Sequence, residues 1–326
     1  MTEFIPGLPI EQAGLIMEMH SQETPLVVID QERSIVAGEL SLSEHVEIIF
    51  YDEGWDSRVY MINGGEIVYK FPRSPYVMQG YSREIATLRM LEDTTSSKVT
   101  TQRFRSLDPG NRYFSYRGVV GTQLSELMGS MEADEKQRIG TTVGLFLREL
   151  HALVLDGAPV VTADDEIKEY QTKYRLAMPV IESHFSTDEQ LRIAKFFLDQ
   201  MPAEIESLGS ESRLCHGDLG SYNIVIGEDG TTGIIDFGNV GYYDQSKDFI
   251  DFGDDVVLLA ALEAYGDSEL LRAKVVVRTI ALSVIDLVYY MSKKDNEGLM
   301  STVERLRALL QSLPNDSSPG GSENHG

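Results

Sequence analysis

Two polar stretches in the second half of the chain indicate the fold: CHGDLGSYNI at residues 215–224 and IIDFG at residues 234–238. The apolar runs on either side of the Glu-Asp-Gly turn at 228–230 predict a short β-hairpin. Such a hairpin would bring Asn223 and Asp236 together at its open end. An amide oxygen and a carboxylate are hard ligands that suit Mg²⁺ held jointly with phosphate groups. We therefore expect Asn223 and Asp236 to be metal ligands.

Asp218 stands five residues before Asn223 and is the candidate catalytic base. A carboxylate beside the metal could accept the proton of an attacking hydroxyl group, as phosphoryl transfer requires. The same intervals occur in the catalytic set of protein kinases, although Gly217 here replaces the Arg of that motif. The structural alternative is a loop of Asx turns with a solvent-facing Asp218. The residue types, both intervals and the strand context favour the phosphoryl-transfer site.

A second polar pair lies in the first third of the chain. Runs at 58–62 and 66–71 are joined by Asn-Gly-Gly, which predicts a tight hairpin. Lys70 lies on the second of these strands, and Glu84 follows fourteen residues later at the start of an expected helix, 84–91. A strand Lys that holds phosphates and a helix Glu that orients it are parts of the kinase scheme. An exposed Lys at a strand end is common. The assignment of Lys70 and Glu84 to a nucleotide site therefore depends on the presence of the Asp218 segment.

These motifs together resemble the aminoglycoside phosphotransferase family of the kinase-like superfamily, over roughly residues 46 to 312. EGWDSRVY at 53–60 and YKFPR at 69–73 look most like the 2″-type enzymes. The resemblance implies an α+β, bilobal protein-kinase-like fold, with a small β-rich N-terminal lobe and a larger, mainly helical C-terminal lobe. It also implies Mg²⁺ and ATP or GTP as phosphate donor.

The nucleotide site lacks a Gly-x-Gly-x-x-Gly motif before Lys70. Gly54, with Asp56 and Ser57, is expected to form the loop over the nucleotide, where Ser57 could meet the phosphates; an ordinary strand-connecting turn is the alternative. The resemblance places the hinge near residues 117–119. Its three expected nucleotide-binding residues are Arg117, Gly118 and Val119. Backbone recognition leaves no side-chain signature, so ATP and GTP stay undistinguished.

The acceptor is expected to be a small molecule rather than a protein. Only eleven residues separate Asp236 from Asp248, too few for a long peptide-binding segment, and no Ala-Pro-Glu follows. The family pattern assigns Asp248 to bonding the backbone of the catalytic loop. The same pattern lines the acceptor site with carboxylates, because aminoglycosides carry several ammonium groups. Three acidic residues are candidates, Asp254 first, then Asp255 and Asp251; a solvated helix face is the alternative for each.

The composition is that of an ordinary globular chain, 42% hydrophobic and 25% charged. Its net charge of −24 repels nucleic acid and anionic lipid and attracts a cationic partner. No charge-free stretch exceeds nine residues, so we expect no membrane segment. With no secretory signal visible at the start and one cysteine, Cys215, we expect a cytoplasmic protein, and a monomer.

Four segments are expected along the chain: an N-terminal extension at 1–45, a nucleotide-binding lobe with hinge at 46–118, a catalytic and acceptor-binding lobe at 119–313, and a disordered tail at 314–326. Residues 25–29 could form a strand, and helices are expected at 135–154, 187–200, 248–265, 268–293 and 298–312. His151 and His216 are expected to be structural.

Taken together, the residues predict a small-molecule kinase, and the family resemblance implies transfer of the γ-phosphate to a hydroxyl of an aminoglycoside antibiotic. Two alternatives stay open at this point. One is a kinase for another small metabolite, such as a sugar derivative or an amino alcohol. The other is a non-catalytic nucleotide-binding module, although intact Lys70, Glu84, Asp218, Asn223 and Asp236 argue against it.

Overall fold

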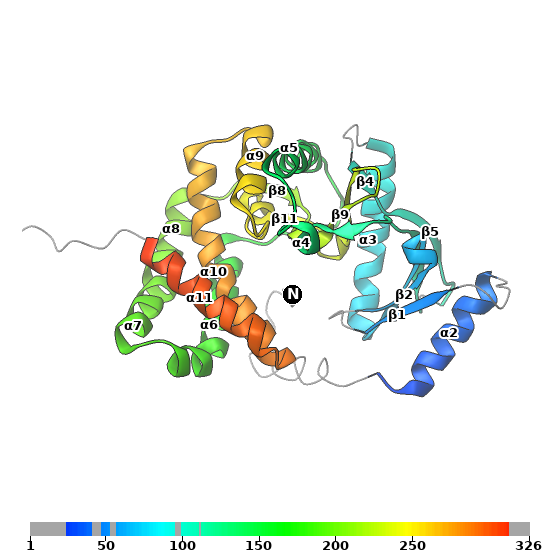
Figure 1. Ribbon diagram of the computed structural model, residues 1–326, viewed down its shortest axis with the longest axis horizontal. Coiled ribbons are helices and arrows are strands. Elements are labelled where there is room, and N and C mark those ends of the chain that lie inside the picture. Colours follow the sequence, from blue (N-terminus) through cyan, green and yellow to red (C-terminus); the bar gives the residue numbers. More distant parts are fainter. Residues whose placement is uncertain (1–23, 41–46, 53–56, 95–98, 111, 313–326) are drawn as a thin grey trace, which may run out of the picture.

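The computed structural model describes residues 24–40, 47–52, 57–94, 99–110 and 112–312. Within these ranges the chain forms a β-rich lobe and a larger helical lobe, which lie side by side in Figure 1. The expected α+β, bilobal kinase-like architecture is therefore confirmed. The expectations for Gly54 and Asp56 and for the tail at 314–326 lie outside the described residues.

The smaller lobe is built on a five-stranded antiparallel sheet with strand order β1-β2-β3-β6-β5. Its elements are α2 (Leu26–Leu40), β1 (Ile48–Tyr51), β2 (Ser57–Ile62), β3 (Ile67–Pro72), α3 (Pro75–Thr94), β5 (Arg103–Leu107) and β6 (Phe114–Arg117). The expected hairpin is confirmed: Ile62 pairs with Ile67, and Asn63, Gly64 and Gly65 turn between them with positive φ.

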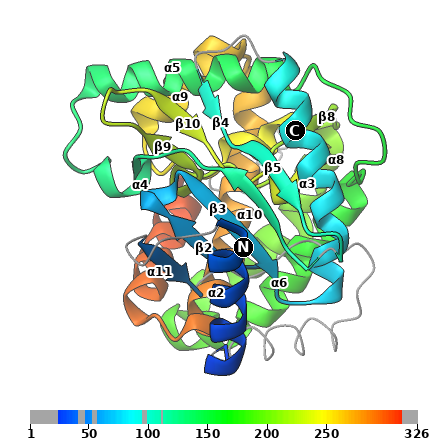
Figure 2. The same cartoon turned by 90° about the vertical axis from the view of Figure 1, so that its right-hand side faces the viewer.

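Alternation along the strands gives this sheet two apolar faces. One face, with Val68 and Phe114, packs against α3. The other, with Tyr60 and Tyr69, packs against α2, which lies in front of the sheet in Figure 2. The helix α2 is thus a layer of the lobe.

The structure corrects two expectations in this lobe. Residues 25–29 are not a strand, because α2 begins at Leu26. The β-branched run has high strand propensity, but packing of Val36, which is fully buried, and of Glu32 on the sheet outweighs it. Glu84 lies in the middle of α3 rather than at the start of a helix, because the helix begins at Pro75, a residue favoured in the first turn.

The larger lobe holds the predicted catalytic hairpin, in which Ile224 pairs with Ile234. The hairpin lies inside a second sheet of order β4-β10-β9-β7, and β8 and β11 form a third. Elements in this part are β4 (Val99–Thr101), β7 (Thr122–Gln123), α4 (Leu124–Leu127), α5 (Ala133–Leu150), α6 (Ala163–His184), α7 (Thr187–Lys195), α8 (Met201–Leu208), β8 (Ser212–Cys215), β9 (Ile224–Ile226), β10 (Thr232–Ile234), β11 (Gly241–Asp244), α9 (Asp255–Tyr265), α10 (Glu269–Lys293) and α11 (Asn296–Ser312).

Most expected helices of this lobe are present, but several ranges differ, and the short helices α4 and α8 were not expected. The segment 187–200 divides into α7 and a π-helical turn, Phe196–Gln200, which leads into α8. The helix expected from 248 begins only at Asp255, because the Asp254 side chain caps it. The helix α6 was not expected, although Thr162 and Asp165 form a capping box that marks its start in the sequence.

Among the described residues, one helix, α10, is long and apolar enough by composition to cross a membrane. Its most apolar 18-residue window is 61% buried inside the protein. Val284 and Leu287 on it belong to the core of the helical lobe. The apolar character of α10 is accounted for by this packing.

Candidate active site

The two lobes meet at a three-residue ion cluster. The ammonium of Lys70, on β3, lies 3.1 Å from both carboxylate oxygens of Glu84, on α3. It also donates to Oδ1 of Asp236 at 2.9 Å. Gly238 is close by: a Cβ built there would lie within 3.7 Å of all three side chains. The Lys70–Glu84 pair expected from the sequence is therefore formed. Its ammonium also contacts Asp236 in the IIDFG stretch at 234–238.

Burial and charge oppose one another in this cluster. Burial lowers the pKa of Lys70, but Asp236 and Glu84 outweigh it and hold that pKa well above its ordinary value. Loss of water would raise the pKa of Asp236, but the Lys70 ammonium lowers it overall. Both groups are charged at neutral pH, as a phosphate- and metal-binding site requires.

The catalytic loop brings Asp218 and Asn223 together. The side-chain amide of Asn223 donates to the backbone carbonyl of Asp218 at 2.8 Å, which orients the amide. The backbone carbonyl of Asn223 accepts from Ile235 N at 3.0 Å. Asp218 is held from a second side by the Tyr222 hydroxyl, 2.9 Å from its Oδ1. Burial raises the pKa of the Asp218 carboxyl, and a nearby His216 opposes the rise.

Asp236 combines a strained backbone with a half-exposed carboxylate. Its φ of 65° and ψ of 69° lie in the left-handed region, which a non-glycine residue adopts at a cost of about 1–3 kcal/mol. Its backbone N–H donates to Gln102 Oε1 at 3.0 Å, which helps to hold this conformation. The carboxylate is 49% exposed and so accessible to a ligand. Together with the Asn223 amide, these hard oxygen donors fit Mg²⁺.

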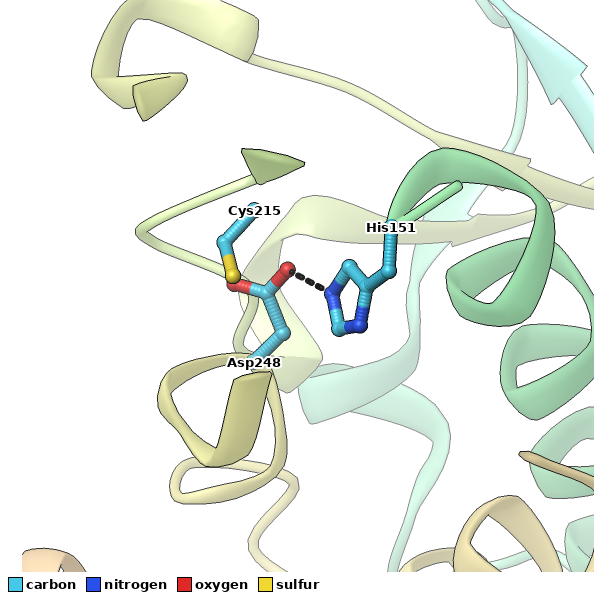
Figure 3. Close-up of side chains that lie close together, drawn as sticks. All are labelled: His151, Cys215 and Asp248. Atoms are coloured by element: carbon cyan, nitrogen blue, oxygen red, sulfur yellow. Dashed lines mark hydrogen bonds and ion pairs between the residues drawn. The ribbon is translucent and has the colours of Figure 1, made fainter. Parts of the chain in front are cut away.

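Below the loop, three buried side chains form the group drawn in Figure 3: His151, Cys215 and Asp248. Asp248 accepts from the backbone N–H groups of His216 at 2.7 Å and Gly217 at 2.8 Å, and contacts His151 Nε2 at 3.0 Å. Burial raises the pKa of the Cys215 thiol, so the sulfur stays protonated. The spacing would suit a metal ion, but the hydrogen bonds make this group a brace for the catalytic loop.

The backbone at position 217 explains why the Arg of the kinase motif is missing here. Gly217 has φ of 82°, and a Cβ there would lie 2.3 Å from the Asn239 carbonyl oxygen. Only glycine fits such a position without moving the backbone. His216 is structural as expected: its Nε2 lies 2.9 Å from the Ile235 carbonyl and its Nδ1 lies 3.3 Å from Asp218 N.

The residues expected to contact the nucleotide differ in burial and in hydrogen bonding. Ser57 is buried at the start of β2, and its hydroxyl shares a 2.9 Å hydrogen bond with Tyr81 on α3. Arg117 ends β6 with an exposed side chain. Gly118 N donates to the Glu66 carbonyl at 3.2 Å, so this N–H has a partner within the sheet, and Val119 follows it.

The three acceptor candidates have different surroundings. Asp251 lies beside the catalytic loop, where its carbonyl accepts from Ser221 N at 3.1 Å. Asp254 accepts from Val256 N and Val257 N as the cap of α9, and it pairs with Lys136 at 2.8 Å. Asp255 is exposed on the first turn of that helix. Position therefore favours Asp251 over Asp254, the reverse of the order expected from the sequence.

Two residues near the base were not expected, Tyr222 and Asp286. Asp286 lies on α10 and forms an ion pair with Arg305 on α11. Burial, followed by the Asp286 charge, raises the pKa of Asp251 to about 7. No motif spacing points to Asp286; its one signal is a carboxylate between Ile285 and Leu287 in an apolar helix.

Comparison with known proteins agrees with this site. The profile of the phosphotransferase enzyme family matches residues 47–274. A mutant of aminoglycoside 2'-phosphotransferase-IIIa in complex with GDP superposes with a TM-score of 0.68 at 20% identity, over 86% of this chain and 96% of that chain. An APH(2″) enzyme bound to GDP and kanamycin gives 0.65 at 21%, over 86% and 98%.

A choline kinase of Streptococcus pneumoniae also superposes, with a TM-score of 0.59 at 14% identity, over 87% of this chain and 100% of that chain. At such identities the solved structures establish a shared kinase-like fold. The family profile goes further, because it spans more than half of the chain and includes both catalytic motifs. The protein therefore belongs to the phosphotransferase enzyme family.

Proposed function

We propose that this phosphotransferase moves the γ-phosphate of ATP or GTP to a hydroxyl group of an aminoglycoside antibiotic. One observation carries the proposal: the Lys70 ammonium, held by Glu84, reaches the Asp236 carboxylate. Asp218 and Asn223 lie on the loop before the same hairpin, and a hydrogen bond links them. Neither a bare nucleotide-binding module nor a structural role needs all five groups intact.

In this mechanism Lys70 binds the α- and β-phosphates, and Glu84 keeps its ammonium in place. Asn223 and Asp236 would hold Mg²⁺, which supplies charge neutralisation on the phosphate oxygens when bound. Asp218 orients the acceptor hydroxyl and takes its proton as the oxygen attacks the γ-phosphorus in line with the leaving group. Positioning and electrostatics supply most of the acceleration.

Carboxylates close to the base support a cationic acceptor. Asp251 lies against the catalytic loop, and its pKa is raised first by burial and then by the neighbouring Asp286. An ammonium group placed between them would relieve the repulsion, and the net charge of −24 favours cations at longer range. Asp254 and Asp255 at the start of α9 are proposed as outlying contacts. Ser57, Arg117, Gly118 and Val119 remain the proposed nucleotide contacts.

A kinase for an amino alcohol is the second candidate. Arg305 already neutralises part of the acidic group through Asp286, which suits an acceptor with a single ammonium. The likeness to a choline kinase is compatible with this candidate. We also propose that the protein is a monomer in the cytoplasm, where the buried thiol of Cys215 would stay reduced.

The test is a phosphate-transfer assay with labelled ATP or GTP and Mg²⁺. The acceptors are kanamycin, gentamicin, streptomycin, choline and a simple sugar. Transfer to the aminoglycosides alone is the expected result. Transfer only to choline or the sugar would replace the acceptor and keep the chemistry. Nucleotide binding with no transfer to any of the five would contradict the proposed activity.

A further inference from the structure

The side chain of Tyr222 contacts the proposed base directly and has no part in the mechanism described so far. Its hydroxyl donates to Oδ1 of Asp218 at 2.9 Å. The carboxylate of Asp251, whose backbone carbonyl accepts from Ser221 N, also lies close to Tyr222. The proposed base and the proposed acceptor carboxylate therefore both lie close to the side chain of Tyr222.

Gly220 provides the space for this ring. Its backbone, with φ of −123° and ψ of 172°, is extended and open to any residue. A Cβ built there would lie 2.3 Å from Cε1 and 2.7 Å from Cζ of Tyr222. The same Cβ would lie 3.0 Å from Oδ2 of Asp251. A side chain at position 220 would thus collide with the ring of Tyr222. The need for glycine there comes from this contact and not from the backbone conformation.

A buried carboxylate on a short side chain can rotate, and catalysis needs one of its oxygens aimed at the acceptor hydroxyl. A hydrogen bond to an ionised group is stronger than one between neutral groups, and a tyrosine loses little conformational freedom on ordering. We propose that Tyr222 is a positioning residue, whose hydroxyl holds Oδ1 of Asp218 so that the second oxygen faces the acceptor. This inference rests on the proposed function, because it takes Asp218 as the base.

The proposal separates turnover from nucleotide binding. The Asn223 amide is oriented by the Asp218 carbonyl, not by the Tyr222 hydroxyl. Lys70 is held by Glu84 and Asp236, on the other side of the site. Loss of the hydroxyl should therefore leave the metal and phosphate groups in place while the base loses its alignment.

The first test compares Tyr222→Phe with the wild-type chain in the presence of Mg²⁺. The readouts are kcat for transfer to each acceptor of the panel above, KM for ATP, and slow ATP hydrolysis without acceptor, in which water replaces the hydroxyl. Misalignment of a catalytic group can cost about 100-fold, so we expect kcat and hydrolysis to fall about 10- to 100-fold. KM for ATP should stay within about twofold of wild type.

Tyr242→Phe is the matched control. Tyr242 lies on β11, and its hydroxyl accepts a hydrogen bond from Leu155 N at 3.0 Å, so the variant loses one tyrosine hydroxyl and one bond elsewhere in the lobe. It should keep kcat and KM. An equal fall of kcat in both variants would mean a general loss of structure and would overturn the positioning role.

Gly220→Ala tests the same contact without touching Tyr222. The added methyl must displace the ring, so turnover should fall as in Tyr222→Phe. In a Tyr222→Ala background, where no ring remains, Gly220→Ala should cost little more. Unchanged kcat in Tyr222→Phe, with a wild-type chain that transfers phosphate or hydrolyses ATP, overturns this inference alone. A wild-type chain that does neither contradicts the proposed function as well.

Discussion

The ammonium of Lys70 and the carboxylate of Asp236 lie 2.9 Å apart although they are 166 positions apart in the chain. One belongs to the third strand of the small lobe and the other follows the hairpin of the large lobe. Lys70 also contacts Glu84, so one ammonium lies between two carboxylates, one from each lobe. The proposed phosphate-binding and metal-binding groups are thus adjacent, and a nucleotide with Mg²⁺ would have to separate this ion pair to contact both.

Asp236→Ala should remove the Mg²⁺ dependence of nucleotide binding. The variant deletes a hard oxygen donor, and loss of a metal ligand should weaken metal-supported binding by at least about 10- to 100-fold. Titration of the protein with ATP, with and without Mg²⁺, measures the effect. Asp229→Ala, at the exposed turn of the same hairpin, is the control and should bind as wild type. Undiminished Mg²⁺ dependence in Asp236→Ala would rule out the metal role.

Asp218→Asn should abolish transfer and leave nucleotide affinity nearly intact. The amide keeps the size of the carboxylate and can still accept from Tyr222, but it cannot take a proton. Loss of a general base costs about 10²- to 10⁴-fold in rate. Steady-state kinetics and an ATP binding titration on the same preparation separate the two quantities. Wild-type turnover in this variant would refute the base assignment.

Asp251→Asn should change how stability depends on pH. The pKa of Asp251 is raised to about 7 by burial and by Asp286, with Asp218 adding to the rise and Arg305 and Tyr222 opposing it. A proton held more tightly in the folded chain stabilises it fully below about pH 4, and this stabilisation is lost as the pH rises through 7.

The variant should therefore melt at a higher temperature than wild type at pH 8 and lose this advantage towards pH 4. Melting curves across that range provide the measurement. Asp255→Asn, on the exposed first turn of α9, should follow the wild-type curve. Parallel curves for Asp251→Asn and wild type would show that Asp251 ionises normally. If Asp251 also binds the acceptor cation, the same variant should raise KM for that acceptor.

Asp254→Ala should lower stability, because the carboxylate caps α9 and pairs with Lys136. Removal of such a cap typically costs about 1 kcal/mol. For a chain of this size we expect a fall in Tm of about 1–2 °C. Asp255→Ala is the neighbouring control without a cap and should melt close to wild type. An unchanged Tm in Asp254→Ala would argue against the capping role.

The sequence predicted the parts of the site that lie in fixed order on one supersecondary unit. Asp218, Asn223 and Asp236 are spaced along a loop and hairpin, so their intervals determine their proximity. Lys70 and Glu84 were paired on the kinase scheme, with weight from the Asp218 segment. The position of Glu84 within its helix was wrong, since residues before it continue the helix to Pro75.

Contacts between elements that are far apart in the sequence could not be predicted from motif spacing. Asp286 reaches the site because α10 crosses the large lobe, and no local spacing encodes that crossing. In the sequence, Tyr222 is an ordinary loop residue. Its special position becomes evident only in the structure, where a Cβ at position 220 would collide with its ring. For residues 25–29 the local β-propensity favoured a strand, whereas the chain forms a helix that is stabilised by the sheet it covers.

That helix has a practical consequence for anyone who re-engineers the protein. A chain trimmed to start at residue 46 would lose Glu32, whose carboxylate binds Arg58 at 2.6 Å and Tyr60 at 2.9 Å, and would uncover an aromatic surface of Tyr60, Tyr69 and Phe71. Purification tags and fusion partners therefore belong ahead of Thr24. A shorter version would need polar replacements on the bared strands to stay in solution.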